Sequence, residues 1–176
     1  MLIKQITLSN FRQYKEKQVV EFSCDKEKNV TVILGDNTSG KTTLIQAFNW
    51  CLYGLTSFKT RELINSESLQ EMGLYSTNEV SVEVELQHEE RLYVIRRTQT
   101  VTKNEPNRAP TFARPTLKVE YQEANGEMQE VPSVEAQNTV DKILPEALSG
   151  YFFFDGEHIA DINNKGNVVS AVRGSN

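Results

Sequence analysis

The chain has 176 residues, of which 38% are hydrophobic and 24% charged, a composition that is ordinary for one globular domain. No apolar run approaches the roughly 20 residues that cross a bilayer, and the N-terminus has no signal-peptide layout, so we expect a cytoplasmic protein without a membrane partner. The formal net charge of −5 disfavours a dedicated nucleic-acid surface, which is usually basic. Cys24 and Cys51 lack a recognisable spacing, so we expect small buried or neutral residues there.

A local basic patch remains compatible with this net charge. Its members would be Lys59, Arg61, Arg96, Arg97, Lys103, Arg108 and Arg114. We favour the simpler interpretation that these residues belong to a solvated charged face, because charges that are spread along a chain usually serve that purpose.

The N-terminal part of the chain predicts three strands. Residues 2–9 and 18–22 are rich in β-branched or alternating apolar residues, and the run NVTVIL at 29–34 is typical of a buried parallel strand. Two strands thus precede the strand that leads into the glycine-rich loop after residue 34. A typical Rossmann chain reaches its loop directly after the first strand, so this order indicates another subclass of P-loop protein.

The stretch GDNTSGKTT, residues 35–43, fits the pattern of a glycine, four residues and then Gly-Lys-Thr. Gly35 and Gly40 allow the backbone to curl so that successive N–H groups point into one concavity, which favours an anion. Lys41 would supply a positive charge for the β- and γ-phosphates, and Thr42 a hydroxyl for Mg²⁺. The helix that starts here directs its positive end at the same phosphates. The predicted ligand is a nucleoside triphosphate with Mg²⁺.

A helix follows the loop, and its apolar residues recur at helical spacing until Gly54 supplies a stop. These residues are Leu44, Ala47, Phe48, Cys51 and Leu52. The segment 61–72 is weakly helical. Residues 79–87 alternate without error and predict a half-buried strand, with residues 92–101 as its hairpin partner. The apolar face of the first strand would hold Val80, Val82, Val84 and Leu86.

The second half of the chain predicts more β structure and then a helix. Residues 102–115 hold three prolines and predict a loop, whereas 116–122 and 128–131 predict a hairpin around Asn125-Gly126. We therefore expect an inserted antiparallel β layer at about 79–131. A short helix should follow Ser133 and end before Pro145. Its inward residues would be Val134, Val140, Ile143 and Leu144.

A second chemical group is expected near residue 155. Phosphoryl transfer needs an acidic or polar group that holds Mg²⁺ or positions water, and the aromatic run 151–154 predicts a buried strand that ends at Asp155. Asp155 would then be a Walker B aspartate with Glu157 nearby, or a residue that only begins a turn. A GTPase is disfavoured because NNKGN at 163–167 lacks the aspartate of a guanine reader, and a small-molecule kinase because no arginine-rich lid is present.

The strings ITLSNFRQY, VILGDNTSGKTTLIQAFNWCLYG and YFFFDGEHI, in this order and spacing, resemble the N-terminal half of the ATPase head of SMC-like proteins. The resemblance is strongest to DndD-like ATPases of DNA phosphorothioation and phage-defence systems, and more distant to SbcC-type repair ATPases. It implies an α/β fold, namely a P-loop NTPase of the ABC-ATPase head type, N-lobe, with an inserted antiparallel β layer.

The resemblance also implies roles for single residues. Arg12 would contact the nucleotide near its α-phosphate or ribose, and Arg61 matches only loosely an arginine that SMC heads use near DNA. The segment 151–159 corresponds to a Q-loop in which Asp155 replaces the glutamine that reaches Mg²⁺ and the attacking water. The residues expected to bind ATP are Arg12, Gly35, Asn37, Thr38, Ser39, Gly40, Lys41, Thr42 and Thr43; Lys41 and Asp155 would be catalytic, and Thr42 and Asp155 would bind Mg²⁺.

The family's signature Ser-Gly-Gly motif, Walker B Asp-Glu pair and switch histidine are not found in this sequence, and the segment 148–150 is too short a match for the signature. Residues 1–176 are thus expected to form an N-lobe whose partners are its own C-lobe, a second head in a homodimer, DNA, and other proteins of the same modification, defence or repair system. The isolated chain should hydrolyse ATP poorly. Two alternatives are a non-catalytic nucleotide-gated interaction module and a stand-alone P-loop phosphotransferase.

Overall fold

The computed structural model describes residues 1–36, 39–58, 62–105 and 108–153. Its centre is one seven-stranded sheet with the order β2-β1-β3-β4-β6-β7, and β5 pairs with β4. All of these pairs are antiparallel. The strands are β1 (Leu2–Phe11), β2 (Tyr14–Glu21), β3 (Ser76–His88), β4 (Arg91–Lys103), β5 (Thr111–Phe112), β6 (Thr116–Gln122) and β7 (Met128–Glu130).

The antiparallel strands predicted at about 79–131 are present, and the N-terminal strands β1 and β2 belong to the same sheet. β1 pairs with β3 in a register that sets Ile6 against Val84 and Leu8 against Val82. All four side chains are fully buried. Because side chains of a strand alternate between two faces, this register gives β1 and β3 one common apolar face.

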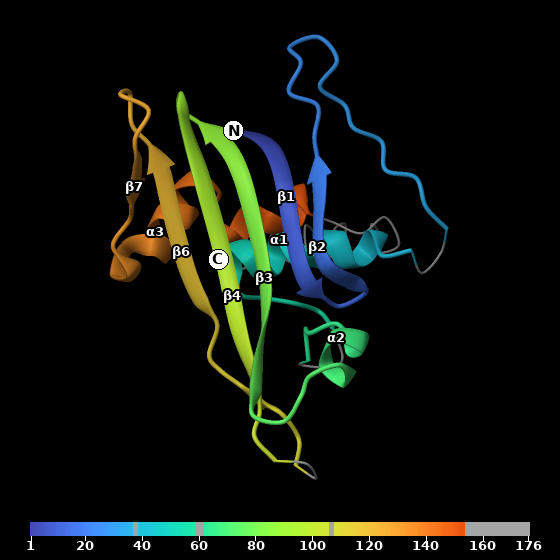
Figure 1. Cartoon of the computed structure of the whole chain (residues 1–176). Helices are drawn as coiled ribbons and strands as arrows, with labels where there is room; N and C mark the ends of the chain where they lie inside the picture. The colour runs from blue at the N-terminus through green and yellow to red at the C-terminus, as the bar shows by residue number, and fades with distance from the viewer. Residues whose placement is uncertain (37–38, 59–61, 106–107, 154–176) are drawn as a thin grey trace, which may run out of the picture.

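Two helices cover that apolar face (Figure 1). They are α1 (Lys41–Tyr53), which begins at the glycine-rich loop, and α3 (Ser133–Ile143). The short helix α2 (Ser66–Gln70) lies beside the β1–β2 turn, and a 3-10 turn (Glu146–Leu148) and α4 (Ser149–Phe152) follow α3. The five apolar residues predicted for the buried face of α1 are all buried. No helix in the described part of the chain is long and apolar enough to span a membrane.

The opposite face of the sheet carries paired charges. Arg96 lies within 4 Å of Glu79 and Glu83, and Lys118 bonds Glu120 and Glu130. Arg97 points the other way, into the core, and is 8% exposed, so its assignment to a surface patch was wrong. The alternation of the strand explains this, because neighbouring residues face opposite sides. Lys59 and Arg61 lie outside the described residues.

The run 29–34 is not the predicted buried strand. It has no strand or helix assignment, and the exposed fractions of Val30, Val32 and Leu34 are 77%, 72% and 88%. This part of the chain runs away from the sheet in the long connection between β2 and α1 (Figure 1). An apolar run forms a strand only beside a neighbour that takes up its N–H and C=O groups, and no described strand pairs with it.

The aromatic run 151–154 was also predicted as a buried strand, whereas its described part continues the helical turns after Pro145. Tyr151 and Phe152 belong to α4 and are 67% and 56% exposed. Only Phe153 packs inward, where its ring stacks on Phe48 at a centroid distance of 4.9 Å. Hydrophobicity alone did not distinguish a strand from a short helix here.

Two smaller predictions need correction. Residues 102–115 include β5, which pairs with the end of β4 through Val101 and Phe112. Val134 is exposed, because the phase of α3 turns Ala136 and Val140 toward the core instead. The helix ends before Pro145, as predicted: Ile143 is its last residue and is partly buried, and Leu144, which follows it, is buried.

Candidate functional site

The glycine-rich loop makes a tight curl in front of α1. Gly40 has a φ of 105°, and a Cβ at this position would lie 3.0 Å from the Tyr14 hydroxyl. A Cβ at Gly35 would collide with the Ser39 side chain. The Ser39 N–H donates to the Asp36 carbonyl at 3.1 Å and closes a turn. The geometry therefore requires a glycine at position 40, whereas a side chain at position 35 would displace the Ser39 side chain.

Lys41 turns its ammonium back into this curl. Nζ donates to the Gly35 carbonyl at 2.6 Å and to the Asp36 carbonyl at 2.7 Å. The structure thus brings Lys41 together with the first residues of the loop, although they are five and six positions apart. An ammonium that donates to two neutral carbonyls can donate to phosphate oxygens instead, since a hydrogen bond between two charged groups is stronger.

The N-terminus of α1 presents a favourable electrostatic end for an anion. Gly40 provides no side-chain cap, and the first turn of α1 holds no acidic residue. The positive end of the helix dipole is therefore not neutralised by the helix itself. α2 is different, because the Asn65 side chain accepts from the Glu67 and Ser68 N–H groups at its start. Together with Lys41 and the glycine curl, the start of α1 fits a phosphate group.

The turn between β1 and β2 contacts the loop directly. The Tyr14 hydroxyl donates to the Gly40 carbonyl at 3.1 Å, and the Thr43 hydroxyl donates to Gln13 Oε1 at 2.8 Å. Thr43 is 5% exposed, so its hydroxyl faces the turn. Sequence reasoning missed Gln13 and Tyr14 as site residues. The only signal was their place in the string ITLSNFRQY, next to Arg12.

Arg12 occupies the same turn and has a left-handed φ of 54°. Its guanidinium donates to the Glu62 carbonyl at 3.0 Å and lies over the Phe58 ring at 4.7 Å. Arg12 and Gln13 line an open pocket of about 280 Å³ with Ile64 and Ser66. Arg12 is therefore next in the sequence to Gln13, whose side chain bonds Thr43, and Arg12 lines the open pocket described above.

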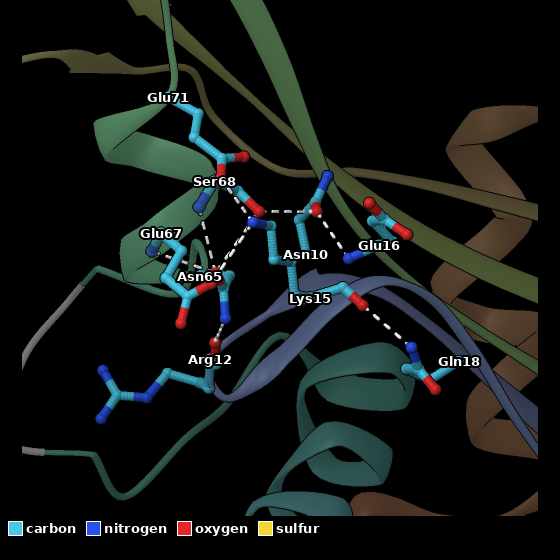
Figure 2. A network of polar contacts seen from close by, with 9 residues as sticks. All are labelled: Asn10, Arg12, Lys15, Glu16, Gln18, Asn65, Glu67, Ser68 and Glu71. Atoms are coloured by element: carbon cyan, nitrogen blue, oxygen red, sulfur yellow. Dashed lines mark hydrogen bonds and ion pairs between the residues drawn. The ribbon is translucent and has the colours of Figure 1, made fainter.

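A polar network fixes this turn from its other side (Figure 2). Asn65 Nδ2 donates to the Arg12 carbonyl at 2.6 Å, and the Leu63 carbonyl accepts the Arg12 N–H at 2.7 Å. Ser68 Oγ donates to Asn10 Oδ1 at 2.9 Å, which also accepts the Glu16 N–H. The turn is therefore held between the loop and α2.

Lys15 adds an electrostatic contact to this network. Its ammonium reaches Glu71 at 2.5 Å and Glu67 at 3.3 Å, both on the α2 side (Figure 2). The hydrogen bond to Glu71, followed by that to Glu67, raises the pKa of Lys15. All three groups are solvent-accessible, so the contact contributes little to stability and mainly orients the side chains.

Three expected ligands lie outside the described residues: Asn37, Thr38 and Asp155. Among the described residues, no group of three or more His, Cys, Asp or Glu side chains could hold a metal ion. Thr42 is exposed at the start of α1, next to Lys41. The described residues thus offer a lysine, a glycine-rich loop and an open helix start, a combination that suits phosphate groups.

Comparison with known proteins gives consistent results. A family model described as AAA domain (AAA_23) matches residues 5–165. The chain is 40% identical over 67 residues to the DNA replication and repair protein RecF of Clostridium kluyveri, which is 37% of this chain and 17% of RecF. It is 33% identical over 97 residues to the DNA double-strand break repair Rad50 ATPase of Methanococcus maripaludis, which is 55% of this chain and 9% of that protein. The chain therefore spans less than a fifth of these relatives.

A solved structure from work on ATP-driven dimerization and DNA stimulated activation of SMC ATPases has a similar fold. The TM-score is 0.53 at 21% identity, over 93% of this chain and 98% of that chain. The likeness confirms the predicted fold class, an α/β P-loop NTPase head with an antiparallel sheet.

Proposed function

The chain belongs to the AAA_23 family of AAA domains, and from this premise we propose that it is the N-terminal, ATP–Mg²⁺-binding lobe of an SMC-like ATPase that acts on DNA. The observation that carries the proposal is the position of the Lys41 ammonium, which lies against the Gly35 and Asp36 carbonyls at the start of a helix without a side-chain cap. The names of the RecF and Rad50 relatives support a role in DNA repair.

Each part of the loop would have a separate task. Lys41 would exchange the Gly35 and Asp36 carbonyls for phosphate oxygens, and the first N–H groups of α1 would bind the same phosphates. Thr42 would bind Mg²⁺, and Asn37, Thr38, Ser39 and Thr43 would complete the cradle through their backbones and side chains. Arg12 would reach the nucleotide from the β1–β2 turn. The bound Mg²⁺ would neutralise charge that develops on the phosphates during hydrolysis.

We place Asp155 at the metal as a Q-loop or Walker B group. The position of Phe153, which is two residues before Asp155 in the sequence, supports this proposal. The Phe153 ring stacks on Phe48 of α1, the helix that follows the glycine-rich loop. Asp155 would hold Mg²⁺ or orient the attacking water. Replacement by asparagine should leave ATP binding in place and reduce turnover in the whole protein.

The exposure of the apolar run 30–34 supports the proposal that another part of the whole protein covers these residues. Val30, Val32 and Leu34 are more than 70% exposed, which is unusual for a run of aliphatic residues in a stable fold. In the proposed head, the protein's own C-lobe would pair with this run and bury it. Two such heads would then enclose two ATP molecules, each bound by Lys41 of one head and by the signature motif of the other, so that hydrolysis would reopen the dimer.

The more specific assignment is to DndD-like ATPases of DNA phosphorothioation or phage defence. It rests on the resemblance of the strings around Arg12, Lys41 and Asp155, whereas the relatives named above are replication and repair proteins. In this assignment the lobe would act with other proteins of the same system. Loss of the modification or of phage resistance in a strain that carries Lys41→Ala would support it; unchanged modification with a repair defect would favour the repair role.

The direct test is ATP binding in the presence of Mg²⁺, measured by titration calorimetry. Lys41→Ala should weaken binding roughly 10- to 100-fold, as expected for the loss of a charged hydrogen bond. Lys118→Ala is the matched control, because Lys118 is a surface lysine on the opposite face of the sheet. Equal binding by the wild type and Lys41→Ala, or no binding at all, would refute the proposal. Binding without turnover in the whole protein would favour a nucleotide-gated interaction module.

A further inference from the structure

We propose that Gln13 and Tyr14 are positioning residues of the phosphate loop: they hold Thr43 and Gly40 so that the first N–H groups of α1 point at the bound phosphates. The inference rests on the proposed function, because it assigns these residues a part in ATP binding. Neither residue is in the glycine-rich motif, and both come from a turn that is 26 or more positions earlier in the chain.

Tyr14 acts on the peptide group between Gly40 and Lys41. The Gly40 carbonyl accepts two hydrogen bonds, one from the Tyr14 hydroxyl at 3.1 Å and one from the Leu44 N–H at 2.9 Å. Because a peptide group is planar and trans, a fixed C=O also fixes the direction of the Lys41 N–H on its opposite side. That N–H therefore points out of the helix, toward the loop. A tyrosine hydroxyl is a donor at neutral pH, and burial raises the pKa of Tyr14 further from that range.

Gln13 acts on Thr43, three residues after Gly40. Its Oε1 accepts a hydrogen bond from the Thr43 hydroxyl at 2.8 Å, which ties the buried side chain of Thr43, in the first turn of α1, to the β1–β2 turn. Gln13 and Tyr14 thus fix the loop-to-helix junction at two points.

The turn that carries Gln13 and Tyr14 is itself rigid. Asn10, Arg12 and Glu16 have left-handed φ values of 50°, 54° and 56°, which are costly for residues other than glycine. Such conformations persist where the surroundings determine them, and here the Arg12 N–H and C=O are both bonded, to Leu63 and Asn65. The strained turn is therefore a fixed support against which the start of α1 is held.

The test compares two deletions of a single hydroxyl. Tyr14→Phe removes the bond to Gly40, and Tyr53→Phe removes an equivalent bond from the other end of α1 to the Leu144 carbonyl at 2.9 Å. Tyr14→Phe should weaken ATP–Mg²⁺ binding to the 176-residue chain roughly three- to tenfold, the size of one hydrogen bond. Tyr53→Phe should lower the unfolding temperature and leave the dissociation constant unchanged. Gln13→Met should resemble Tyr14→Phe.

The outcome of this test distinguishes a failure of the positioning role from a failure of the proposed function. If the wild type binds ATP, Lys41→Ala does not, and Tyr14→Phe and Gln13→Met bind like the wild type, the positioning role is wrong while the proposed function stands. If Tyr14→Phe and Tyr53→Phe lose affinity in proportion to their loss of thermal stability, Tyr14 serves only the fold and the inference also fails. If the wild type does not bind ATP, both ideas fail together.

Discussion

The two ends of α1 differ in how their backbone groups are satisfied. At the N-terminus, Gly40 provides no side-chain cap, Lys41 is exposed, and the hydrogen bonds to the junction come from a separate turn. At the C-terminus, Gly54 takes a left-handed conformation with a φ of 72°, and its N–H bonds the Trp50 carbonyl. There the buried Arg97 guanidinium donates to the Cys51 carbonyl at 3.0 Å and to the Leu52 carbonyl at 3.3 Å.

From this difference we expect the N-terminal end of α1 to matter for ligand binding and the C-terminal end to matter for stability. The negative end of the helix dipole has an internal cation, Arg97, whereas the positive end has no acidic side chain in its first turn. In the proposed function a phosphate would bind at this end, where Lys41 and Thr42 are exposed. Changes at the C-terminal end should therefore affect unfolding, and changes at the N-terminal end should affect ligand binding.

The largest effect on stability is expected at Arg97. Arg97→Met removes the donors to Cys51 and Leu52 in a buried place and should destabilise the fold by about 2 kcal/mol. Chemical denaturation measures this difference. Arg96→Met, on the opposite face of the same strand, removes only exposed ion pairs and should cost about 0.5 kcal/mol or less. A stabilised Arg97→Met variant would show that desolvation of the buried guanidinium outweighs its hydrogen bonds.

The two left-handed glycines next to α1 form the second test. Gly40→Ala and Gly54→Ala should each cost about 1–2 kcal/mol of stability, because both φ values are unfavourable for alanine. Gly40→Ala should in addition weaken ATP binding, since its Cβ meets the Tyr14 hydroxyl at 3.0 Å and displaces the loop. Calorimetry and thermal unfolding on both variants measure the contrast. Equal affinities of the two variants would remove the distinction between the ends.

A smaller effect is expected from the ionisation of Tyr53. Burial, followed by Asp141 and Glu146, raises the pKa of Tyr53 from 10.0 to about 12. A raised folded-state pKa means that the folded chain retains this proton while the unfolded chain loses it. The contribution of Tyr53 is therefore complete below about pH 10 and decreases as pH rises toward about 12. The stability difference between the wild type and Tyr53→Phe, measured by denaturation, should shrink over that range; a constant difference would contradict the shift.

The smallest effect is expected from thiol labelling, which tests how often the fold opens around Cys51. Cys51 is fully buried on α1, where its thiol lies 3.3 Å from the Val82 and Ile95 carbonyls, and burial raises its pKa to about 12. Cys24 is exposed. Iodoacetamide at about pH 8 should modify Cys24 readily and Cys51 only when the fold opens, because the thiolate is the reactive species. Mass spectrometry of the Cys24→Ser variant isolates Cys51. Rapid labelling of Cys51 without denaturant would show that the C-terminal half of α1 opens easily.

Local patterns predicted much of the molecule. The alternation from Val80 to Leu86, the Asn125-Gly126 turn and the spacing along α1 each match the structure, because periodicity and turn chemistry act over a few residues. The curl of Gly35 and Gly40 around Lys41 also follows from the motif. The errors at 29–34 and 151–154 have one cause: an apolar run does not specify which neighbour, if any, will pair with it.

The amino-acid sequence by itself determined where the glycine-rich loop lies and which faces of α1 and β3 are apolar, since these features depend on glycine and on spacing within one segment. Only the tertiary structure decided that β1 joins β3, that Arg97 enters the core at the end of α1, and that Gln13 and Tyr14 reach the loop. These contacts join residues 26 to 85 positions apart, from Tyr14–Gly40 to Leu2–Gln87, and no local pattern encodes them. The topology of the chain brings these residues close together, and the packing of distant segments then fixes the contacts between them.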